Sequence, residues 1–400
     1  MRQQNKRHVM NKWKLRNKQL YILLRYSVAK VLSYLLPAKL FAKDLWLVCE
    51  RGTDARDNGY FFYKYLREKH PHIPCVYVIT RNSPDYNKVA TLGNVVHYGS
   101  LQHLYYINTA KHLISTHAAG FLWNSHWIRD GILKRFYRHK GNFIFLQHGV
   151  IIHYLAGLIY PTYQCDLFIC SAKKEYEYVK NTYGHPDGVV QYTGLCRFDY
   201  LHRFTIKKQI LLMPTWRLYL NGLNDSAFLQ SDYYKAFSQL LTDPRLEEIL
   251  EFYDYELIFY PHYEIQKFLP LFHSPFSRVK LAVFKQYDVQ TLLKESALLI
   301  TDYSSVFFDF AYMKKPLIYY QFDKKSFYDN HYAKGYFDCD TMGFGKVAHT
   351  FDELLDRIRE TVKAGCALQE PFQSRINTYY ELYDTNNSQR IFECICRLEK

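Results

Sequence analysis

Short, fully apolar runs recur along the chain after residue 43, separated by segments long enough for amphipathic helices. Strands that are apolar on both faces are typical of parallel sheets covered by helices on each side. The runs form two groups of five, which predicts an α/β protein with two doubly wound Rossmann-type domains facing a central cleft. They span 44–50, 75–80, 112–116, 142–147 and 167–171, then 210–216, 256–261, 279–283, 297–301 and 317–322.

A polar and basic stretch at 200–209 separates the two groups of runs and marks a domain boundary. We therefore predict one domain over 44–204, a second over 205–373 and a C-terminal helix over 374–400, which TYYELYD (378–384) interrupts. Residues 1–43 precede the first run and form a separate N-terminal arm.

Apolar positions between residues 20 and 36 recur at helical spacing, and Pro37 ends the segment. Arg25 and Lys30 interrupt the run, and 17 residues is at the lower limit for crossing a bilayer. We expect an amphipathic helix lying on an anionic membrane surface. The alternative is an ordinary docking helix with a solvated basic tail. The predicted apolar face consists of Leu20, Leu24, Val28, Val31 and Leu35.

Charge is distributed unevenly along the 400 residues. Residues 1–43 hold 11 Lys or Arg and no acidic residue, whereas the rest holds 41 basic and 38 acidic residues. The net charge of +14 thus belongs mainly to the arm, and a nucleic-acid binder more often carries its basic stripe on the folded body. We expect no nucleic acid partner. An apolar content of 48% excludes a disordered chain, and nine cysteines without a CxxC pair predict reduced thiols in the cytosol.

Polar residues follow several predicted strands directly. They are His148 and Gly149, then Thr215, Trp216 and Arg217, then His262, and finally the segment 302–305. Because ligands of open α/β sheets bind outside the carboxyl ends of strands, these residues predict one cleft between the two domains.

The cleft residues suit phosphate chemistry. His148 can accept a proton from an alcohol, and His262 can donate to a phosphate or a departing oxygen. Ser304 and Ser305 lie where a strand turns into a helix, which favours binding of an anion such as a diphosphate. Arg197 and Arg217 can add positive charge. For each histidine the alternative is a packed side chain, for the serines a plain helix cap, and for each arginine a surface ion pair.

Motifs for other chemistry are missing from the sequence. There is no GxGxxG after a strand, no P-loop, no HExxH and no GxSxG, and Asp338-Cys339-Asp340 resembles a DxD metal motif but lies in a Gly-containing loop far from the strand runs. We expect neither a metal nor a cofactor, so that Arg, His, hydroxyl and helix-end groups must balance the phosphate charge.

Six segments resemble one known family and occur in that family's order. They are QHGV (147–150), TGLCRFD (193–199), MPTWR (213–217), YPHYE (260–264), QYDVQTLL (286–293) and TDYSSVFFDFAYMKKPLIYYQFD (301–323). They resemble the CDP-glycerol glycerophosphotransferases, the teichoic-acid-type polymerases and primases of bacterial cell envelopes. The resemblance runs over residues 45–362, and DNGYFFYKYLR (57–67) also resembles the start of that domain.

The resemblance implies a GT-B-like pair of domains, an N-terminal acceptor domain and a C-terminal domain that binds most of the donor. It implies transfer of glycerol phosphate from CDP-glycerol to a hydroxyl of a lipid-linked or polymer acceptor, with release of CMP. Members are peripheral proteins on the cytoplasmic face of the bacterial membrane. In this family's pattern His148 is the general base and His262 contacts donor phosphate. The donor-binding positions map to Gly149, Arg197, Thr215, Trp216, Arg217, Tyr287, Asp288, Ser304, Ser305 and Asp309.

The sequence departs from the family at two places. Many members continue the HG motif as HGTPLK, whereas here it reads HGVIIH, and Cys196 replaces the usual proline before Arg197. CDP-ribitol as the donor, a nucleotide-sugar transferase of similar fold and a non-catalytic membrane-binding module remain the alternatives. The acceptor, single addition versus polymerisation and the oligomeric state stay open.

Overall fold

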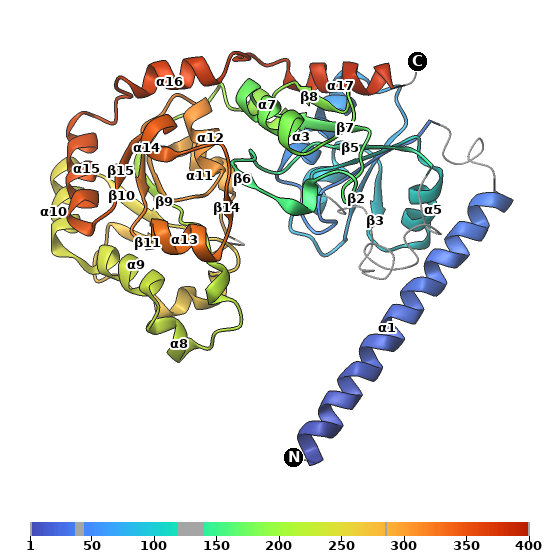
Figure 1. Cartoon of the computed structure of the whole chain (residues 1–400), viewed down its shortest axis with the longest axis horizontal. Helices are drawn as coiled ribbons and strands as arrows, with labels where there is room; N and C mark the ends of the chain where they lie inside the picture. Colours follow the sequence, from blue (N-terminus) through green and yellow to red (C-terminus); the bar gives the residue numbers. More distant parts are fainter. Residues whose placement is uncertain (1, 37–43, 118–139, 285, 399–400) are drawn as a thin grey trace.

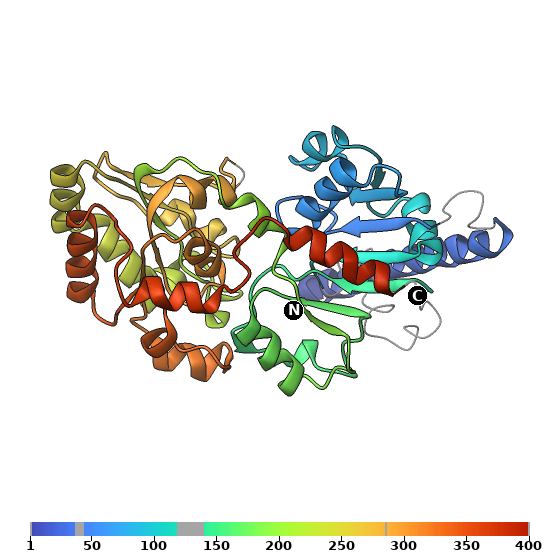
Figure 2. The same cartoon turned by 90° about the horizontal axis from the view of Figure 1, so that it is seen from above.

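Two parallel sheets form the frame of the molecule. The structure is a computed structural model that describes residues 2–36, 44–117, 140–284 and 286–398. They lie in two lobes joined near the middle of the chain (Figures 1 and 2). The predicted α/β class with two parallel sheets is confirmed.

The first sheet has seven strands in the order β3-β2-β1-β4-β5-β7-β8, all parallel. Its strands are β1 (Trp46–Cys49), β2 (Cys75–Ile79), β3 (Val95–His97), β4 (His112–Ser115), β5 (Asn142–Phe145), β7 (Leu167–Cys170) and β8 (Val190–Tyr192). The second sheet has six parallel strands in the order β11-β10-β9-β12-β13-β15. Its strands are β9 (Lys207–Leu212), β10 (Glu256–Phe259), β11 (Val279–Leu281), β12 (Ser296–Thr301), β13 (Leu317–Tyr320) and β15 (Lys346–Ala348).

Helices alternate with these strands, as expected for doubly wound sheets. The first half holds α3 (Asn58–Lys69), α4 (Tyr86–Ala90), α5 (Leu101–Thr109), α7 (Lys173–Thr182) and the 3-10 helices η2 (Ala156–Leu158) and η3 (Cys196–Tyr200). The second half holds α8 (Asp225–Leu229), α9 (Asp232–Thr242), α10 (Pro244–Tyr253), α11 (Val289–Glu295), α12 (Val306–Tyr312), α13 (Lys324–Asn330), α14 (Cys339–Met342), α15 (Phe351–Lys363), α16 (Phe372–Tyr379), η4 (Leu218–Leu220) and η5 (Gln266–Leu271).

All ten apolar runs predicted as strands contain one, and most strand residues in them are buried. The pattern missed β3, β8 and β15, which have only three residues each and are partly exposed at sheet edges. It also missed the two-residue strands β6 (His153–Tyr154) and β14 (Ala333–Lys334). These pair antiparallel and join the two halves.

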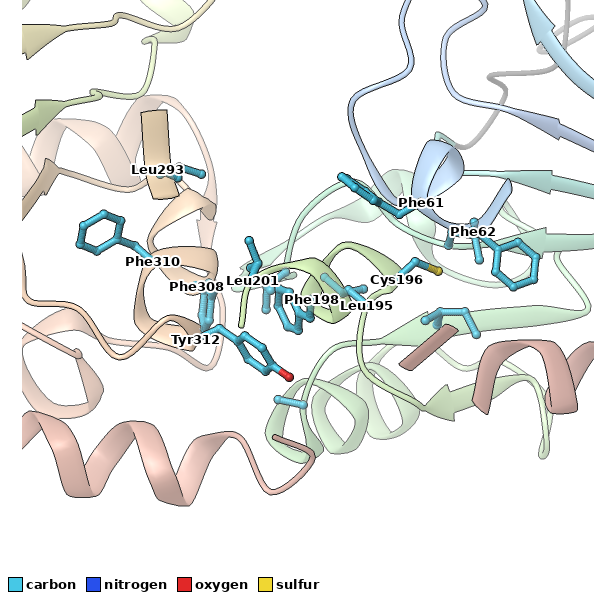
Figure 3. Close-up of a cluster of buried hydrophobic side chains, with 14 of the residues drawn as sticks. Phe61, Phe62, Leu195, Cys196, Phe198, Leu201, Leu293, Phe308, Phe310 and Tyr312 are labelled. Carbon is cyan, nitrogen blue, oxygen red and sulfur yellow. The ribbon is translucent and has the colours of Figure 1, made fainter. Parts of the chain in front are cut away.

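An apolar cluster fills the junction between the halves. The Phe198 ring on η3 stacks on the Tyr312 ring on α12 with centroids 4.3 Å apart. Figure 3 shows side chains of both halves meeting there, including Phe61, Leu201 and Phe308. The burial of this shared cluster stabilises one relative placement of the two halves.

The chain crosses between the halves twice. The first crossing follows η3, and the second lies between α16 and α17 (Asn387–Arg397), which returns to pack on η3, α3 and β7 of the first half. The crossings touch each other, because the His202 ring nitrogen Nε2 lies 2.8 Å from the Asp384 carbonyl oxygen. The predicted C-terminal helical segment over 374–400 consists of α16 and α17, and the sequence TYYELYD (378–384), which was expected to interrupt it, overlaps the break between them. Residues 399–400 lie outside the described residues.

The predicted N-terminal helix is present as α1 (Arg2–Leu35) and starts earlier than the apolar run alone indicated. Ile22, Tyr26 and Ala29 are buried in one core cluster with residues of α5 and the first sheet. The predicted apolar face is solvent-exposed and comprises Leu20, Leu24, Val28, Val31 and Leu35. Residues 1 and 37–43 of the arm lie outside the described residues, and only the backbone of 2–18 is described. Within the described ranges, no helix is both long and apolar enough to cross a membrane.

Candidate functional site

His148 lies three residues after the end of β5, at the carboxyl edge of the first sheet. Its Nδ1 atom lies 3.3 Å from the carbonyl oxygen of Thr116, which follows β4. Because a carbonyl only accepts hydrogen bonds, Nδ1 carries the ring proton and the lone pair is on Nε2. The predicted base therefore has the tautomer that base catalysis needs.

A second histidine, His117, stacks on His148. The two rings are nearly parallel, at 8°, with centroids 4.4 Å apart. Arg51, two residues after β1, donates from Nε to His117 Nε2 at 2.9 Å, so that His117 is held as its Nδ1-protonated tautomer beside Thr116 Oγ1. The segments that follow β1, β4 and β5 thus contribute Arg51, His117 and His148 to one cluster at the edge of the first sheet.

The surroundings keep both rings neutral. Although His148 is open to solvent on one side, desolvation lowers its pKa to about 4, and the charges of Arg51 and Arg197 lower it further while the Thr116 carbonyl raises it. Desolvation, with His148 and Arg51 beside it, lowers the pKa of His117 to about 2. At neutral pH His148 is unprotonated and can accept a proton.

His262 follows β10 and occupies the corresponding edge of the second sheet. Its ring stacks over Trp216, with centroids 6.2 Å apart, and lies 4.4 Å from the ring of Tyr263. Desolvation, together with the charge of Arg51 and the neighbouring His331, lowers the pKa of His262 to about 4. The guanidinium of Arg51, which bonds the His117 ring stacked on His148, lies 5.2 Å from the centroid of the Tyr263 ring next to His262. The two predicted histidines therefore lie around one space, on opposite halves.

Gly149 and Ser305 bring the two halves into close approach. A Cβ atom added at Gly149 would lie 2.5 Å from Ser305 Oγ, so that only glycine fits there without a shift. Ser304 Oγ accepts a hydrogen bond from the Val306 amide at 3.5 Å, while Ser305 makes no side-chain cap to α12. Ser305 of the predicted serine pair therefore lies next to Gly149, the neighbour of His148. This agrees with the rule that ligand-binding residues of open α/β sheets follow the carboxyl ends of strands, called the strand-end rule below.

Arg197 is buried in ion pairs that link the halves. It donates to both carboxylate oxygens of Asp309, at 2.5 and 2.9 Å, and to Asp57 Oδ1 at 2.9 Å. Nη1 also lies 3.4 Å from the His148 carbonyl oxygen. The two carboxylates raise the pKa of Arg197 against the desolvation that lowers it. Arg197 and Asp309 thus bind each other, and their expected direct contact with donor stays a prediction.

Arg217 is likewise paired within the second half. It is fully buried and donates to Asp323 at 2.7 and 3.0 Å, while Asp302 Oδ2 lies 2.9 Å away. Its Nη1 donates to the Thr215 carbonyl oxygen at 2.7 Å. Of the predicted segment 215–217, Trp216 is the residue whose ring reaches His262. The guanidinium of Arg217 is buried beneath this segment and stabilises it through the hydrogen bond to Thr215, and it does not face the cleft.

A cavity of about 610 Å³ lies between the halves and contains the predicted Tyr287 and Asp288. Asp288 caps α11 by accepting from the Thr291 amide at 2.9 Å. The other lining residues come from both halves: Arg56, Tyr60, Phe61, Lys64, Pro84, Asp85, Lys88, Tyr200, Gln286, Gln290 and Lys294. Four cations against two carboxylates make this space suited to an anion.

The sequence analysis missed Arg51, His117 and the four cations of the cavity. Arg51 and His117 follow β1 and β4, so the same strand-end rule that selected His148 indicates them. The cations Arg56, Lys64, Lys88 and Lys294 carry no sequence signal, because the loop before α3 and the helices α3, α4 and α11 bring them together only in the folded chain.

The DxD-like segment is occupied by ion pairs. Asp338 lies 3.4 Å from Lys324 and 3.2 Å from Lys334, and Asp340 pairs with Lys324. Asp338 also caps α14 by accepting from the backbone amides of residues 340 and 341. In the part of the chain that the structure describes, no group of three or more His, Cys, Asp or Glu is arranged to hold a metal ion.

Comparisons with known proteins identify the family of this chain. Residues 30–397 match the family described as CDP-Glycerol:Poly(glycerophosphate) glycerophosphotransferase. The chain is 31% identical over 370 residues to the minor teichoic acid biosynthesis protein GgaB of Bacillus subtilis strain 168, covering 89% of this chain and 40% of that protein. It is 28% identical over 194 residues to the teichoic acid poly(glycerol phosphate) polymerase of the same strain, covering 48% and 24%. The chain thus spans less than half the length of these relatives.

Solved structures show the same fold. The wall teichoic acid polymerase TagF superposes with a TM-score of 0.67 at 18% identity, covering 97% of this chain and 98% of that chain. A UDP-GlcNAc 2-epimerase from Neisseria meningitidis superposes with a TM-score of 0.51 at 12% identity, covering 88% and 99%. The predicted α/β fold with parallel sheets is therefore shared with both proteins.

Proposed function

Because the chain belongs to the CDP-glycerol:poly(glycerophosphate) glycerophosphotransferase family, we propose that it transfers glycerol phosphate from CDP-glycerol. The acceptor is a hydroxyl of a membrane-linked molecule or of a growing poly(glycerol phosphate)-type polymer of the cell envelope, and CMP is released. The observation that carries the proposal is His148, whose Nδ1 proton is fixed on Thr116 so that the lone pair is on Nε2. The next residue, Gly149, closely approaches Ser305 of the other half.

The reaction is a single in-line displacement. Nε2 of His148 takes the proton of the acceptor hydroxyl, whose oxygen forms a bond to the β-phosphorus of CDP-glycerol. The bond between that phosphorus and the bridging oxygen breaks, and CMP leaves with the electron pair. His262 and the hydroxyls of Ser304 and Ser305 stabilise the charge on the equatorial oxygens. The fold contributes mainly by holding the two reactants in line.

The cavity between the halves supports binding of the nucleotide part of the donor. Its volume of about 610 Å³ lies within the range of small-molecule sites, and its four cations outnumber its two carboxylates, so the lining favours an anionic ligand such as a nucleotide. Tyr60 and Tyr287 offer rings for contact with a base, and the Asp288 carboxylate can accept from an exocyclic amine. Tyr287 and Asp288 come from the segment that the family resemblance assigns to the nucleotide.

The direct test is release of CMP by the purified full chain with a membrane-derived acceptor. CDP-glycerol, CDP-ribitol and a nucleotide sugar are offered in parallel. Changing His148 to Ala is expected to lower turnover by roughly 10²- to 10⁴-fold with little loss of donor affinity, because general-base catalysis contributes about that factor. His273→Ala serves as the control, since this histidine is exposed on the second half.

Turnover of CDP-glycerol that His148→Ala abolishes and His273→Ala preserves supports the proposal. Turnover of CDP-ribitol or a nucleotide sugar alone contradicts the donor, and unchanged turnover in His148→Ala removes this residue from its role. A protein that binds membranes but releases no nucleotide from any donor contradicts the enzyme class.

We further propose that α1 places the enzyme on an anionic membrane surface. Its exposed side chains Leu24, Val28 and Val31 form an apolar stripe, while Ile22 and Tyr26 on the other side anchor the helix to the first half. The 11 basic residues of the first 43 add attraction to anionic lipid. An exposed stripe beside a basic segment is the arrangement that interfacial helices use.

Flotation with phosphatidylglycerol vesicles and with neutral phosphatidylcholine vesicles tests this placement. Changing Leu24 and Val28 together to Glu is expected to lower binding to the anionic vesicles by at least roughly tenfold, because each buried apolar side chain contributes about 1.5–3 kcal/mol. Phe252→Glu is the control, since this residue is 82% exposed on α10. Binding that is equal in all three proteins contradicts the membrane role of α1.

A further inference from the structure

Arg51 is the exposed arginine among the groups that surround the two catalytic histidine candidates. Its Nε donates to His117, while its two terminal nitrogens make no hydrogen bond or ion pair with any side chain in the described ranges. Asp54 is close enough to sense its charge: burial raises the pKa of Asp54, and Arg51 offsets part of this rise. Arg51 thus differs from Arg197 and Arg217, whose terminal nitrogens bind carboxylates.

The loop after β1 holds Arg51 in a fixed place. The buried carboxylate of Glu50 accepts hydrogen bonds from the backbone amides of Arg56, Asp57 and Tyr60, at 2.9, 2.9 and 2.8 Å. Gly52 turns the chain with a φ of +77°, and a Cβ there would lie 2.3 Å from the ring of Tyr98. The arginine therefore stands on a preorganised turn rather than on a free loop.

Arg51 also reaches across the space between the halves. Its guanidinium lies over the Tyr263 ring at 5.2 Å from the centroid, next to His262 of the second half. The charge of Arg51 lowers the pKa of His117, His148 and His262 alike. It is thus positioned among the residues at which the reacting phosphate must lie if the proposed function holds.

We infer that Arg51 is the guanidinium that binds the diphosphate of the donor, with its Nη1 and Nη2 donors facing two phosphate oxygens and its Nε held by His117. A guanidinium fork matches phosphate oxygens in a bidentate manner and keeps its charge at every relevant pH. This inference rests on the proposed function for the identity of the donor, but not for the requirement that the ligand carries a diphosphate.

The inferred contact couples donor binding to the base. A bound diphosphate brings negative charge beside Arg51 and so reduces the effect of its positive charge on His148. The proton affinity of His148 then rises when the donor is in place. The empty enzyme keeps the base neutral, and the loaded enzyme makes it a stronger proton acceptor.

The test measures binding by isothermal titration calorimetry of the full chain with CDP-glycerol, CDP, UDP and CMP. Arg51→Ala is expected to weaken binding of CDP-glycerol and CDP by roughly 10- to 100-fold, because hydrogen bonds to charged groups have about this effect. The loss for CMP is expected to stay under about threefold, since CMP lacks the β-phosphate. Arg51→Lys keeps the charge without the fork and is expected to recover only part of the loss.

Arg359→Ala is the control, because this arginine is exposed on α15. Thermal unfolding of each variant shows that it is folded. Equal affinity of wild type and Arg51→Ala for CDP, or an equal loss for CDP and CMP, overturns the inference, and full recovery in Arg51→Lys overturns its bidentate geometry. If the wild type binds UDP but not CDP, and Arg51→Ala loses UDP, the donor in the proposed function is wrong while the role of Arg51 stands.

Discussion

Arg51 and Arg217 occupy corresponding places in the two halves of the molecule, but their surroundings are opposite. Each follows the first strand of its half, β1 or β9, and these strands hold the third position in their sheet orders. Arg217 is fully buried between Asp302 and Asp323. Arg51 is exposed and donates to a neutral histidine.

The difference arises from residues far away in the chain. Asp323 comes 106 residues after Arg217 and Asp302 follows β12, so that two later segments supply the carboxylates. In the first half, the corresponding space next to Arg51 is filled by His117, which carries no charge. A cation follows a strand end in both halves, but only Arg51, which has no carboxylate ion-pair partner among the described residues, is available to an anion.

Changing Arg217 to Ala gives the largest expected effect on stability. Removal leaves Asp302 and Asp323 buried without a cation, which costs about 3–5 kcal/mol of unfolding free energy. Arg51→Ala is expected to change the same quantity by no more than about 0.5 kcal/mol, because it breaks no ion pair like those of Arg217 and removes only an offset to the burial of Asp54. Urea unfolding followed by circular dichroism measures both. Similar losses in the two variants would show that the contrast between the arginines is wrong.

Gly52 allows a smaller test of how firmly the turn holds Arg51. In Gly52→Ala, the new Cβ must adopt the positive φ of +77° and also clashes with the Tyr98 ring. This substitution is expected to lower the free energy of unfolding by about 2–3 kcal/mol. Gly222 has a similar φ of +74° with nothing near its Cβ position, so Gly222→Ala is expected to cost only about 1 kcal/mol. The same unfolding experiment compares them. Equal costs would mean that Tyr98 moves aside and the turn is not fixed by packing.

The pH dependence of kcat/KM gives the smallest expected effect. The base must be unprotonated, so activity falls as pH falls through the His148 pKa, which burial and the charges of Arg51 and Arg197 lower to about 4. The acid limb is therefore expected near pH 4 rather than near the ordinary histidine value of about 6.5. Arg51→Ala removes one of the lowering charges and is expected to move this limb upward by roughly half a unit.

Arg359→Ala is the matched control for the pH profile, because its charge lies on the exposed surface of α15. It is expected to leave the acid limb where it is in the wild type. A limb that stays in place in Arg51→Ala, or that moves to lower pH, would show that Arg51 does not act on the base.

The sequence was sufficient for the frame of the molecule because its strands are buried on both faces. An apolar run such as LFIC in β7 fits only the buried interior of a sheet, which makes it easy to predict. In contrast, β3 and β15 lie at sheet edges and mix polar with apolar residues, so their sequences carry no clear strand pattern. Because the buried strands were predicted correctly, the strand-end rule also placed His148, His262 and Ser305 correctly at the carboxyl edges of the two sheets, while their roles stay predictions. It could not predict that Arg197 binds Asp309, because 112 residues separate them and the pairing depends on how the halves meet.

Helix α1 shows the limit of periodicity in another way. The apolar positions Leu20, Leu24 and Val28 define one face, but Ile22 and Tyr26 define a second one that packs on the protein. A helix with two apolar faces does not reveal from its sequence which one is covered. The contacts with α5 settle this, since they require a neighbour that is far along the chain.

The two adjacent chain crossings have a consequence for motion. A pair of domains joined by one linker can both bend and swivel, because a single connection resists neither. Here the segment after η3 and the segment before α17 run side by side and are linked by His202 and the Asp384 carbonyl. Such a double connection resists rotation of one half about the linker axis. It leaves mainly a hinge motion in which the cleft between the halves opens and closes. Each closure would then return Gly149 to Ser305 in the same register.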